Sequence, residues 1–318
     1  FLDCTFNKQI LLQERRINKN YFFKDCIFNA IVSIENQKEF SGDKLFLDCE
    51  FPKNICAKNK KEQPNINISD TTFITPFNLL KNEIHRILIR KTIFKESIMI
   101  LEGLKLNSLV IGYSTLEDGF QIHNEYKKDL FLLNKMVFAK CVVNGKFTAR
   151  KCKIIELDFE HTTFNDKLDL FGSELNNTEF ENSVFNNVAI FEHVVFNDDV
   201  NFKFTTFGKL VSFKNAHFKK ELNLEDSIIE NKMNFLQTNN TTINVANRET
   251  ARIIKDSFEQ QNNIIEANKF YALEMKEREN ELDGNIKKGK NLFEWLVFKI
   301  HGISSNHSQD WFLALFWM

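Results

Sequence analysis

The sequence of 318 residues contains only ten glycines, three prolines and six cysteines. The glycines are scattered and neither GxGxxG nor GxxxxGK[ST] occurs, so no nucleotide-binding loop is expected. Six cysteines are too few for a disulfide framework in a chain of this length, and no CxxC pair suggests a zinc or redox site. These absences favour a reducing compartment and exclude several common kinds of enzyme.

An excess of charge of either sign is also absent. Residues 247–318 contain ten of the 42 Lys and Arg and eleven of the 43 Asp and Glu, which leaves 32 of each in residues 1–246. A neutral chain has no field with which to imitate or attract DNA, and the Lys-rich stretch 58–61 has no interleaved aromatic residues. No nucleic-acid partner is therefore expected.

Phenylalanine, in contrast, is abundant: there are 34 Phe beside four Tyr and three Trp. Apolar residues recur at steps of 21 to 23 positions, which indicates a structural repeat. A first column contains Phe6, Phe28, Phe51, Phe73, Phe94, Leu116, Phe138, Phe159, Phe180, Phe202 and Leu224. A second contains Phe1, Phe23, Phe46, Ile68, Ile89, Ile111, Leu133, Ile154, Leu175, Phe196 and Phe218. Two shorter columns contain Phe164, Phe185, Phe207 and Ile229, and Leu170, Phe191, Phe213 and Phe235.

Apolar steps of five and six residues fit neither an α-helix of period 3.6 nor an ordinary alternating strand. A coil with four sides of about five residues fits them, because equivalent residues of successive turns would then stack about 4.8 Å apart. We therefore predict an all-β protein over residues 1–240, a quadrilateral β-helix of about eleven turns of 21–23 residues.

A further column, two positions before the first, is expected to face inward and to hold mostly small residues. It contains Cys4, Cys26, Cys49, Thr71, Thr92, Ser114, Met136, Leu157, Thr178, Val200 and Leu222, of which Met136 and Leu157 are large. Units such as Asp25-Cys26-Ile27-Phe28 and Asp70-Thr71-Thr72-Phe73 make residues 1–240 resemble the pentapeptide-repeat family, although the chain is richer in Phe. The resemblance implies a right-handed coil. Stacking also places Cys4, Cys26 and Cys49 within disulfide reach, but free thiols used as small apolar fillers are favoured.

Two irregular stretches interrupt the repeat. Residues 58–65 are predicted to form a protruding loop that leaves the turn length unchanged, and residues 124–128 supply no apolar residue for the fourth side. The repeat ends after Phe235. Ala251, Ile254 and Phe258, and then Ile264, Ala267, Tyr271 and Met275, have helical spacing on either side of a polar break at 260–263. We predict an αα-hairpin over 247–283 that caps the open end of the coil; a single tetratricopeptide-like unit is the alternative.

Residues 291–318 are predicted to form a further amphipathic helix that leads into an apolar run cut short at Met318. Lys287, Lys288 and Lys290 precede Phe293, Trp295, Leu296, Phe298 and Ile300. Basic residues beside aromatic anchors are typical of the cytoplasmic edge of a membrane span, although the last eight residues are too short to form one. The start at Phe1 and the apolar end suggest a piece of a longer protein. The layout resembles bacterial membrane proteins in which pentapeptide repeats precede a hairpin and transmembrane helices; a soluble helix packed on the rod is the alternative.

The seven histidines show no HxxH or HExxH spacing. His161, His193 and His217 lie between the columns and are expected to point outward, as are the carboxylate pairs Asp198-Asp199 and Glu225-Asp226. No catalytic, cofactor-binding or metal-binding residue, no cofactor and no small-molecule substrate is predicted. The expected function is a non-enzymatic scaffold that binds an unknown protein partner at the cytoplasmic side of a bacterial inner membrane, or in the cytoplasm. A soluble DNA mimic that binds a topoisomerase is the alternative.

Overall fold

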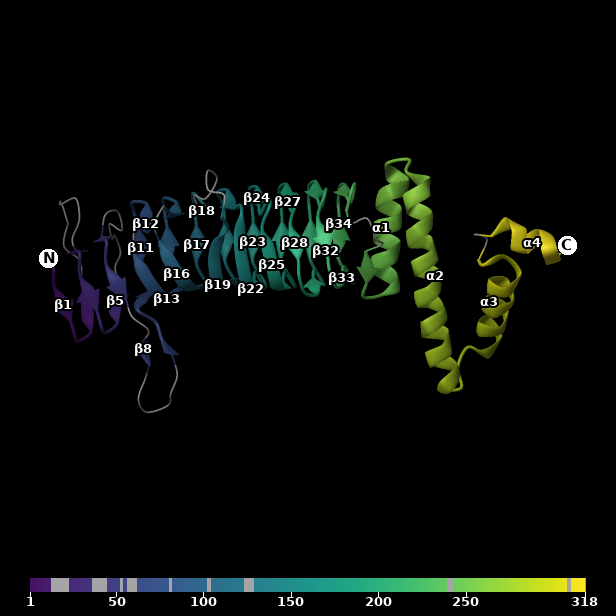
Figure 1. Ribbon diagram of the computed structural model, residues 1–318, viewed down its shortest axis with the longest axis horizontal. Helices are drawn as coiled ribbons and strands as arrows, with labels where there is room; N and C mark the ends of the chain where they lie inside the picture. The colour runs from purple at the N-terminus through teal and green to yellow at the C-terminus, as the bar shows by residue number, and fades with distance from the viewer. Residues whose placement is uncertain are drawn as a thin grey trace.

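The computed structural model describes residues 1–12, 23–35, 45–51, 54–55, 62–79, 82–101, 104–122, 129–238, 243–307 and 310–317. The chain forms a parallel-strand β-solenoid, drawn as a long rod, and helices follow it at the carboxyl end (Figure 1). The helices are α1 (Arg248–Gln260), α2 (Ile264–Lys287), α3 (Leu292–Ser305) and α4 (Trp311–Trp317).

A sheet of 16 strands covers two adjoining sides of the rod. Long strands in the middle turns run across both sides and so join them into one sheet. Its main path comprises β1 (Thr5–Phe6), β4 (Ile27–Phe28), β7 (Glu50–Phe51), β13 (Glu83–Arg90), β16 (Lys105–Gly112), β19 (Phe131–Ala139), β22 (Cys152–Asp158), β25 (Glu174–Glu179), β29 (Val200–Asn201), β33 (Glu221–Asn223) and β36 (Asn244–Val245). The branches are β2 (Ile10–Leu12), β5 (Val32–Glu35), β10 (Ile66–Ser69), β28 (Val195–Phe196) and β32 (His217–Phe218).

Two sheets of eight short strands each form the other sides. One comprises β11 (Thr72–Phe73), β14 (Ile93–Phe94), β17 (Thr115–Leu116), β20 (Val142–Val143), β23 (Thr163–Phe164), β26 (Val184–Phe185), β30 (Thr206–Phe207) and β34 (Ile228–Ile229). The second comprises β12 (Phe77–Leu79), β15 (Ile98–Ile100), β18 (Phe120–Ile122), β21 (Phe147–Ala149), β24 (Leu168–Asp169), β27 (Ala189–Ile190), β31 (Val211–Ser212) and β35 (Met233–Asn234). Two pairs remain, β3 (Phe23–Lys24) with β6 (Phe46–Leu47), and β8 (Asn54–Ile55) with β9 (Glu62–Gln63).

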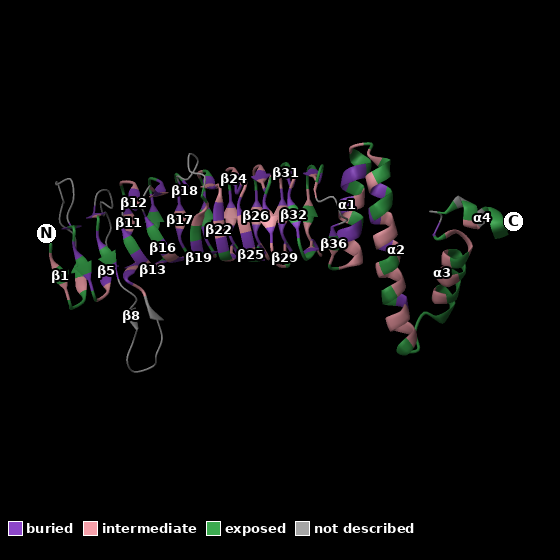
Figure 2. Cartoon of the chain, in the orientation of Figure 1, coloured by how far each residue is buried: buried purple, intermediate pink, exposed green. Residues whose placement is uncertain are grey.

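The predicted four-sided coil with stacked apolar residues is confirmed. Phe73 and Phe94 are fully buried and stack with ring centroids 4.8 Å apart, and Phe180 stacks on Phe202 at 4.5 Å. Every ladder between successive turns is parallel, and the buried residues lie inside the rod (Figure 2). The described strands form about nine turns. The eleven expected are reached only along the main path of the first sheet, which has eleven strands.

The columns change sides at the first irregular stretch, where the predicted constant turn length is wrong. Phe51 stacks on Phe28 as expected, but in the next turn it pairs with Ile84, 33 positions further on, and not with Phe73. The chain leaves the coil between these turns as the antiparallel pair β8–β9, which projects from the rod (Figure 1). Residues 58–61 of the predicted loop lie outside the described residues.

A second change occurs after β18. Leu116 pairs with Val143, 27 positions on, and Ile111 rather than Leu116 pairs with Phe138. Residues 124–128, where the weak side was predicted, lie outside the described residues. The same change corrects the small-residue column, which continues through Cys141, Thr162, Ser183 and Thr205, all of them buried. Met136 and Leu157 pair with each other on another side, where large residues fit.

The corners of the coil place residues in the left-handed backbone region, which the sequence did not reveal. One corner contains Asp70, Lys91, Tyr113, Lys140, His161, Asn182, Phe204 and Asp226, with φ between 48° and 57°. The other contains Asp3, Asp25 and Asp48 in the first turns and Lys151, Gly172, His193, Asn215 and Gln237 in later turns. Asp and Asn tolerate this conformation better than larger residues, so Tyr113 and Phe204 occupy their corners at a cost in stability.

Helix α1 caps the last turn, as predicted. Its Ser257 hydroxyl and Gln261 amide both donate to the Met233 carbonyl oxygen, at 2.6 and 3.0 Å, and the Leu224 N–H donates to the Thr250 hydroxyl at 2.8 Å. Side chains of the helix thus satisfy backbone groups that a further turn would otherwise pair. Phe258 continues the stack of rings beyond Phe235.

The hairpin α1–α2 begins each helix with an asparagine cap, since Asn247 accepts from the Thr250 N–H and Asn263 from the Glu266 N–H. The buried face of α1 contains the predicted Ala251, Ile254 and Phe258. The buried face of α2 differs from the prediction, because it comprises Ala267, Phe270, Glu274 and Leu282. Ile264 is exposed, and Tyr271 and Met275 are half-buried.

Candidate interaction surface

Charged side chains on the rod neutralise one another from turn to turn. Lysines pair with acids of an adjacent turn in Lys95–Glu117, Lys105–Glu83, Lys135–Glu156, Lys153–Glu174, Lys203–Glu225 and Lys220–Asp198. Pairing with Lys220 also lowers the pKa of Asp198. Such exposed pairs add little stability, but they leave no extended field of one sign along this part of the surface. A DNA mimic needs that field.

Histidines that lie between the columns are on the surface of the rod. His161, His193 and His217 point outward as predicted and are exposed. Among the described residues, no three His, Cys, Asp or Glu side chains lie close enough together to hold a metal ion. A hollow of about 740 Å³ on the first sheet is lined by Glu83, Lys105, Leu132 and their neighbours. Its lining combines Glu83 and Lys105, which pair at 3.0 Å, with His85 and aliphatic groups.

The five cysteines that the structure describes are free thiols, and four of them, Cys26, Cys49, Cys141 and Cys152, are buried in the interior. The Sγ atoms of Cys4, Cys26 and Cys49 lie 3.1–3.3 Å from carbonyl oxygens two residues earlier in the chain, and none of the three is disulfide-bonded. Burial raises the pKa of the Cys49 and Cys141 thiols to about 11 and that of Cys152 to about 12. Because the thiolate is the reactive form, these cysteines are packing residues.

We expect Cys141 and Cys152 to resist alkylation in the folded protein. Relative to the ordinary thiol pKa of 9.0, a pKa of about 11 or 12 lowers the thiolate fraction at pH 8 by about 100-fold or 1,000-fold. Iodoacetamide labelling, followed peptide by peptide by mass spectrometry, measures the rate before and after addition of denaturant. Cys4, which is partly exposed, is the internal control. Labelling of Cys152 at the same rate in both conditions would contradict the stacked interior.

Helix α3 contacts the rest of the protein through its polar side. Glu294 pairs with Arg278, Lys299 pairs with Glu279, and the Trp295 indole donates to the Asp283 carboxylate at 2.5 Å. All three partners lie on α2. Bonding to Trp295 lowers the pKa of Asp283, and Lys299 adds to the effect. No residue of α3 is buried, so hydrogen bonds and ion pairs, and not an apolar core, hold α3 against α2.

The opposite side of α3 is apolar and exposed, and Figure 2 shows exposed residues along this helix. We call this side the outer apolar face, and it consists of Leu292, Phe293, Leu296, Val297, Ile300 and Ile303, which are 47–80% exposed. At 100° per residue these six side chains occupy an arc of about 140° of the helix. The following helix α4 adds exposed Phe312, Leu315, Phe316 and Trp317. A continuous exposed patch of this kind marks a site of interaction with a protein or a membrane.

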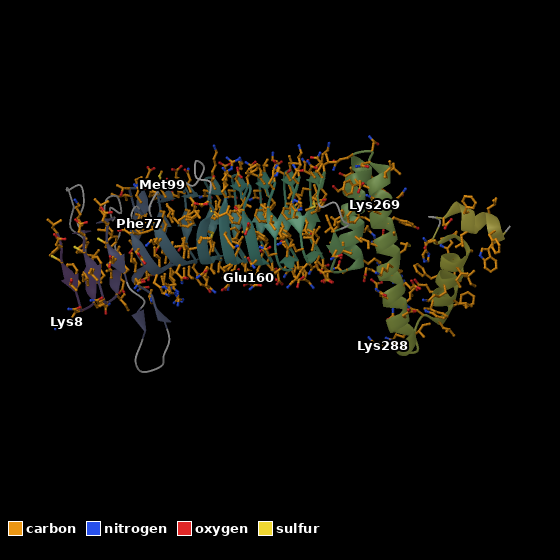
Figure 3. All side chains as sticks on the ribbon, in the orientation of Figure 1. Lys8, Phe77, Met99, Glu160, Lys269 and Lys288 are labelled. Atoms are coloured by element: carbon orange, nitrogen blue, oxygen red, sulfur yellow. The ribbon has the colours of Figure 1, made fainter. Side chains whose placement is uncertain are left out.

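Three cations adjoin the outer apolar face. Lys287, Lys288 and Lys290 are exposed in the turn between α2 and α3, and Figure 3 labels Lys288 at the far end of α2. Sequence reasoning found these lysines and the apolar residues after them, but it grouped Trp295 and Phe298 with Phe293, Leu296 and Ile300 as one set of anchors. Trp295 instead bonds to α2, and Phe298 packs against the ring of His307. The helical period separates these two from the outer face and could have revealed the difference.

The end of α3 is closed by a histidine pair. His307 is buried, its ring lies 4.2 Å from that of Phe298, and its Nδ1 atom lies 3.3 Å from Nδ1 of His301. Burial lowers the pKa of His307, His301 adds to the effect, and Glu279 opposes it. The lowered pKa favours the neutral imidazole, which packs against Phe298 at this turn.

Among the described residues, no helix is both long enough and apolar enough to cross a bilayer. Helix α3, with 14 residues, is about six residues shorter than a span requires.

Comparison with known proteins agrees with the geometry. The structure defines a parallel-strand β-solenoid with a helical carboxyl end. A family model described as pentapeptide repeats (9 copies) matches residues 180–228, which lie in the β-solenoid. No curated protein and no solved structure matches the chain. A parallel-strand β-solenoid of this kind suits a protein-interaction scaffold.

Proposed function

We propose that this chain is a non-enzymatic rod that binds a protein partner and is held at the cytoplasmic side of a bacterial inner membrane by its C-terminal helices. The outer apolar face of α3 carries the proposal. Six apolar side chains of α3 are exposed to water on the side away from α2. Fully burying one such side chain contributes roughly 1.5–3 kcal/mol of stability, so covering this face is favourable. A helix that exposes such a face is suited to binding a membrane surface, which would cover the apolar side chains.

The cations around this face support a membrane on the cytoplasmic side. Lys and Arg are enriched beside apolar segments on that side of bacterial membranes, and an anionic leaflet attracts each nearby lysine by about 1 kcal/mol. Lys287, Lys288 and Lys290 occupy this position next to α3. The rod supports the scaffold part of the proposal, because its interior is a continuous stack of buried side chains and charges on its surface are paired from turn to turn.

Vesicle flotation tests the membrane part. We expect the chain to float with vesicles of phosphatidylcholine and phosphatidylglycerol, and the triple variant Phe293→Gln, Leu296→Gln, Ile300→Gln to remain in the unbound fraction. The matched control is Ile264→Gln with Ile265→Gln, two exposed residues (55% and 77%) at the other end of α2. Circular dichroism verifies that both variants fold. If the unmodified chain does not float, the membrane proposal is wrong.

A further inference from the structure

We infer that α3 lies flat on an anionic lipid surface and that its docking to α2 makes the rod stand upright on that surface. The inference rests on the proposed function and adds to it the class of lipid, the depth of contact and the direction of the rod. Its elements are the outer apolar face, the three lysines and the order in which the helices stack beyond the last turn.

The composition of α3 fits the interface of a bilayer better than its core. Interfacial helices combine one apolar face with a polar face and with Lys or Arg at the headgroup level, and they bury the apolar face only part of the way into the acyl region. Helix α3 is too short to span a bilayer, and its charged residues Glu294 and Lys299 lie on the side that faces α2. A helix lying in the plane of the surface keeps both charges in water.

Charge complementarity selects an anionic surface over a neutral one. Lys287, Lys288 and Lys290 are exposed and form no salt bridge with another described residue, although Lys287 helps to lower the pKa of Asp283. The charged residues Glu294 and Lys299 of α3, in contrast, are paired. Leu292 begins the outer apolar face directly beyond these lysines. Lysines at such a boundary bind anionic headgroups while the adjoining apolar face enters the acyl region.

The order of packing sets the direction of the rod. Helix α1 bonds to the last turn, α2 packs along α1, and α3 is paired to the far side of α2, so the four parts follow one another away from the rod (Figure 1). The side of α3 that contacts α2 looks back toward the rod, and the outer apolar face therefore looks away from it. A surface that touches this face lies across the axis of the rod.

An upright rod places its first turn far from the surface. Ten steps separate β1 from β36 along the main path of the first sheet, and steps of about 4.8 Å give about 48 Å. The sides of the rod are then open to a protein partner all round, whereas a rod lying flat would present only some of them.

Energy transfer to labelled lipid headgroups tests this orientation. A fluorescent amino acid replaces Lys8, at the amino-terminal end, or Lys269, on α2, both labelled in Figure 3, and the full chain is bound to vesicles of phosphatidylcholine and phosphatidylserine. We expect strong transfer from position 269 and weak transfer from position 8. Loosening the dock with Arg278→Gln and Lys299→Gln should preserve binding and reduce this difference, because these two residues hold α3 to α2.

Lipid class is tested with the same vesicles. Replacing Lys287, Lys288 and Lys290 with Gln should weaken binding to phosphatidylserine vesicles on the order of 100-fold and leave the weaker binding to phosphatidylcholine alone unchanged. Equal losses on both vesicles would overturn the choice of an anionic surface.

Three other outcomes overturn the inference in distinguishable ways. Equal transfer from both positions on bound vesicles means that the rod lies flat, which refutes the orientation but keeps the membrane function. Absence of binding to any vesicle refutes the membrane function itself. A dimer in sedimentation equilibrium that Phe293→Gln dissociates, together with absence of vesicle binding, assigns the outer apolar face to a second copy of the chain.

Discussion

Replacing Phe202 with alanine is expected to lower the free energy of unfolding by about 3–5 kcal/mol. Phe202 is fully buried, stacks on Phe180 at 4.5 Å, and meets the rings of Phe191 and Phe213 edge-on at 5.6 and 5.8 Å. Alanine removes the ring from all of these contacts and leaves a cavity that neighbours locked in their own ladders cannot fill. Urea denaturation followed by circular dichroism at the strand band measures the change.

Phe204, two positions further on, provides the matched control. Its side chain is 46% exposed and its φ is 56°, a left-handed conformation that costs a residue with a Cβ about 1–2 kcal/mol. Glycine removes that strain, so Phe204→Gly is expected to leave the free energy of unfolding unchanged or to raise it by up to about 1 kcal/mol. Similar losses in the two variants would contradict the assignment of one residue to the interior and the other to a corner.

The loss of stability caused by Phe202→Ala should also be confined to neighbouring turns. In a solenoid each turn contacts only its neighbours, so stability is close to a sum of terms for turns and for interfaces between adjacent turns. Hydrogen exchange in the variant is expected to accelerate in β25, β29 and β33, which pair in sequence through this turn, and to stay unchanged in β11 and β14. Uniform acceleration would indicate instead that the rod unfolds as a single unit.

Within each uninterrupted stretch, the sequence predicts the interior correctly. The spacing that aligned Phe73 with Phe94 and Phe180 with Phe202 identified pairs that stack in the structure. The reason is physical, since a residue that points into a narrow coil must be apolar in every turn, and a period near 22 satisfies the four sides together. The cap is predictable in the same way, because an open end must be covered and a helical pattern follows it.

Across the insertions, the same spacing misleads. Phe51 and Phe73 are 22 positions apart but lie on different sides, because the chain spends 33 positions between Phe51 and its partner Ile84. All four sides of the coil are apolar, and an excursion of 11 residues is close to the length of two sides. Apolar residues therefore continue to recur about every 22 positions in the sequence, although after the insertion they lie on a different side of the coil. Only the hydrogen-bonded register distinguishes the two alignments.

For the candidate interaction surface, the sequence predicts composition but not direction. The lysines and the apolar residues of α3 were recognisable, and their helical period defines one apolar side. That this side faces outward depends on α2, whose Arg278, Glu279 and Asp283 receive the polar side of α3. An apolar helix face normally turns toward the interior of a protein. The orientation of α3 depends instead on charged residues of α2, and the periodicity of the α3 sequence contains no information about them.

The junction between rod and helices yields the second large effect. Glu274 of α2 is buried, and its carboxylate accepts from Arg252 Nε at 2.8 Å and from Lys255 Nζ at 3.2 Å, both on α1. Replacing Glu274 with alanine leaves Lys255, whose side chain is only 18% exposed, without this partner. We expect the hairpin to lose about 2–3 kcal/mol, below the usual cost of breaking a fully buried pair because Arg252 can reach water.

Glu281 is the control for Glu274, since it also joins the two helices, through Arg248 at 3.3 Å, but its side chain is 42% exposed. Glu281→Ala is expected to cost less than about 1 kcal/mol. Hydrogen exchange should show α1 opening in the Glu274 variant together with β35, because Ser257 and Gln261 of α1 bond to the Met233 carbonyl of that strand. If β35 keeps its protection while α1 opens, α1 does not cap the solenoid, and the last turn is stable without it.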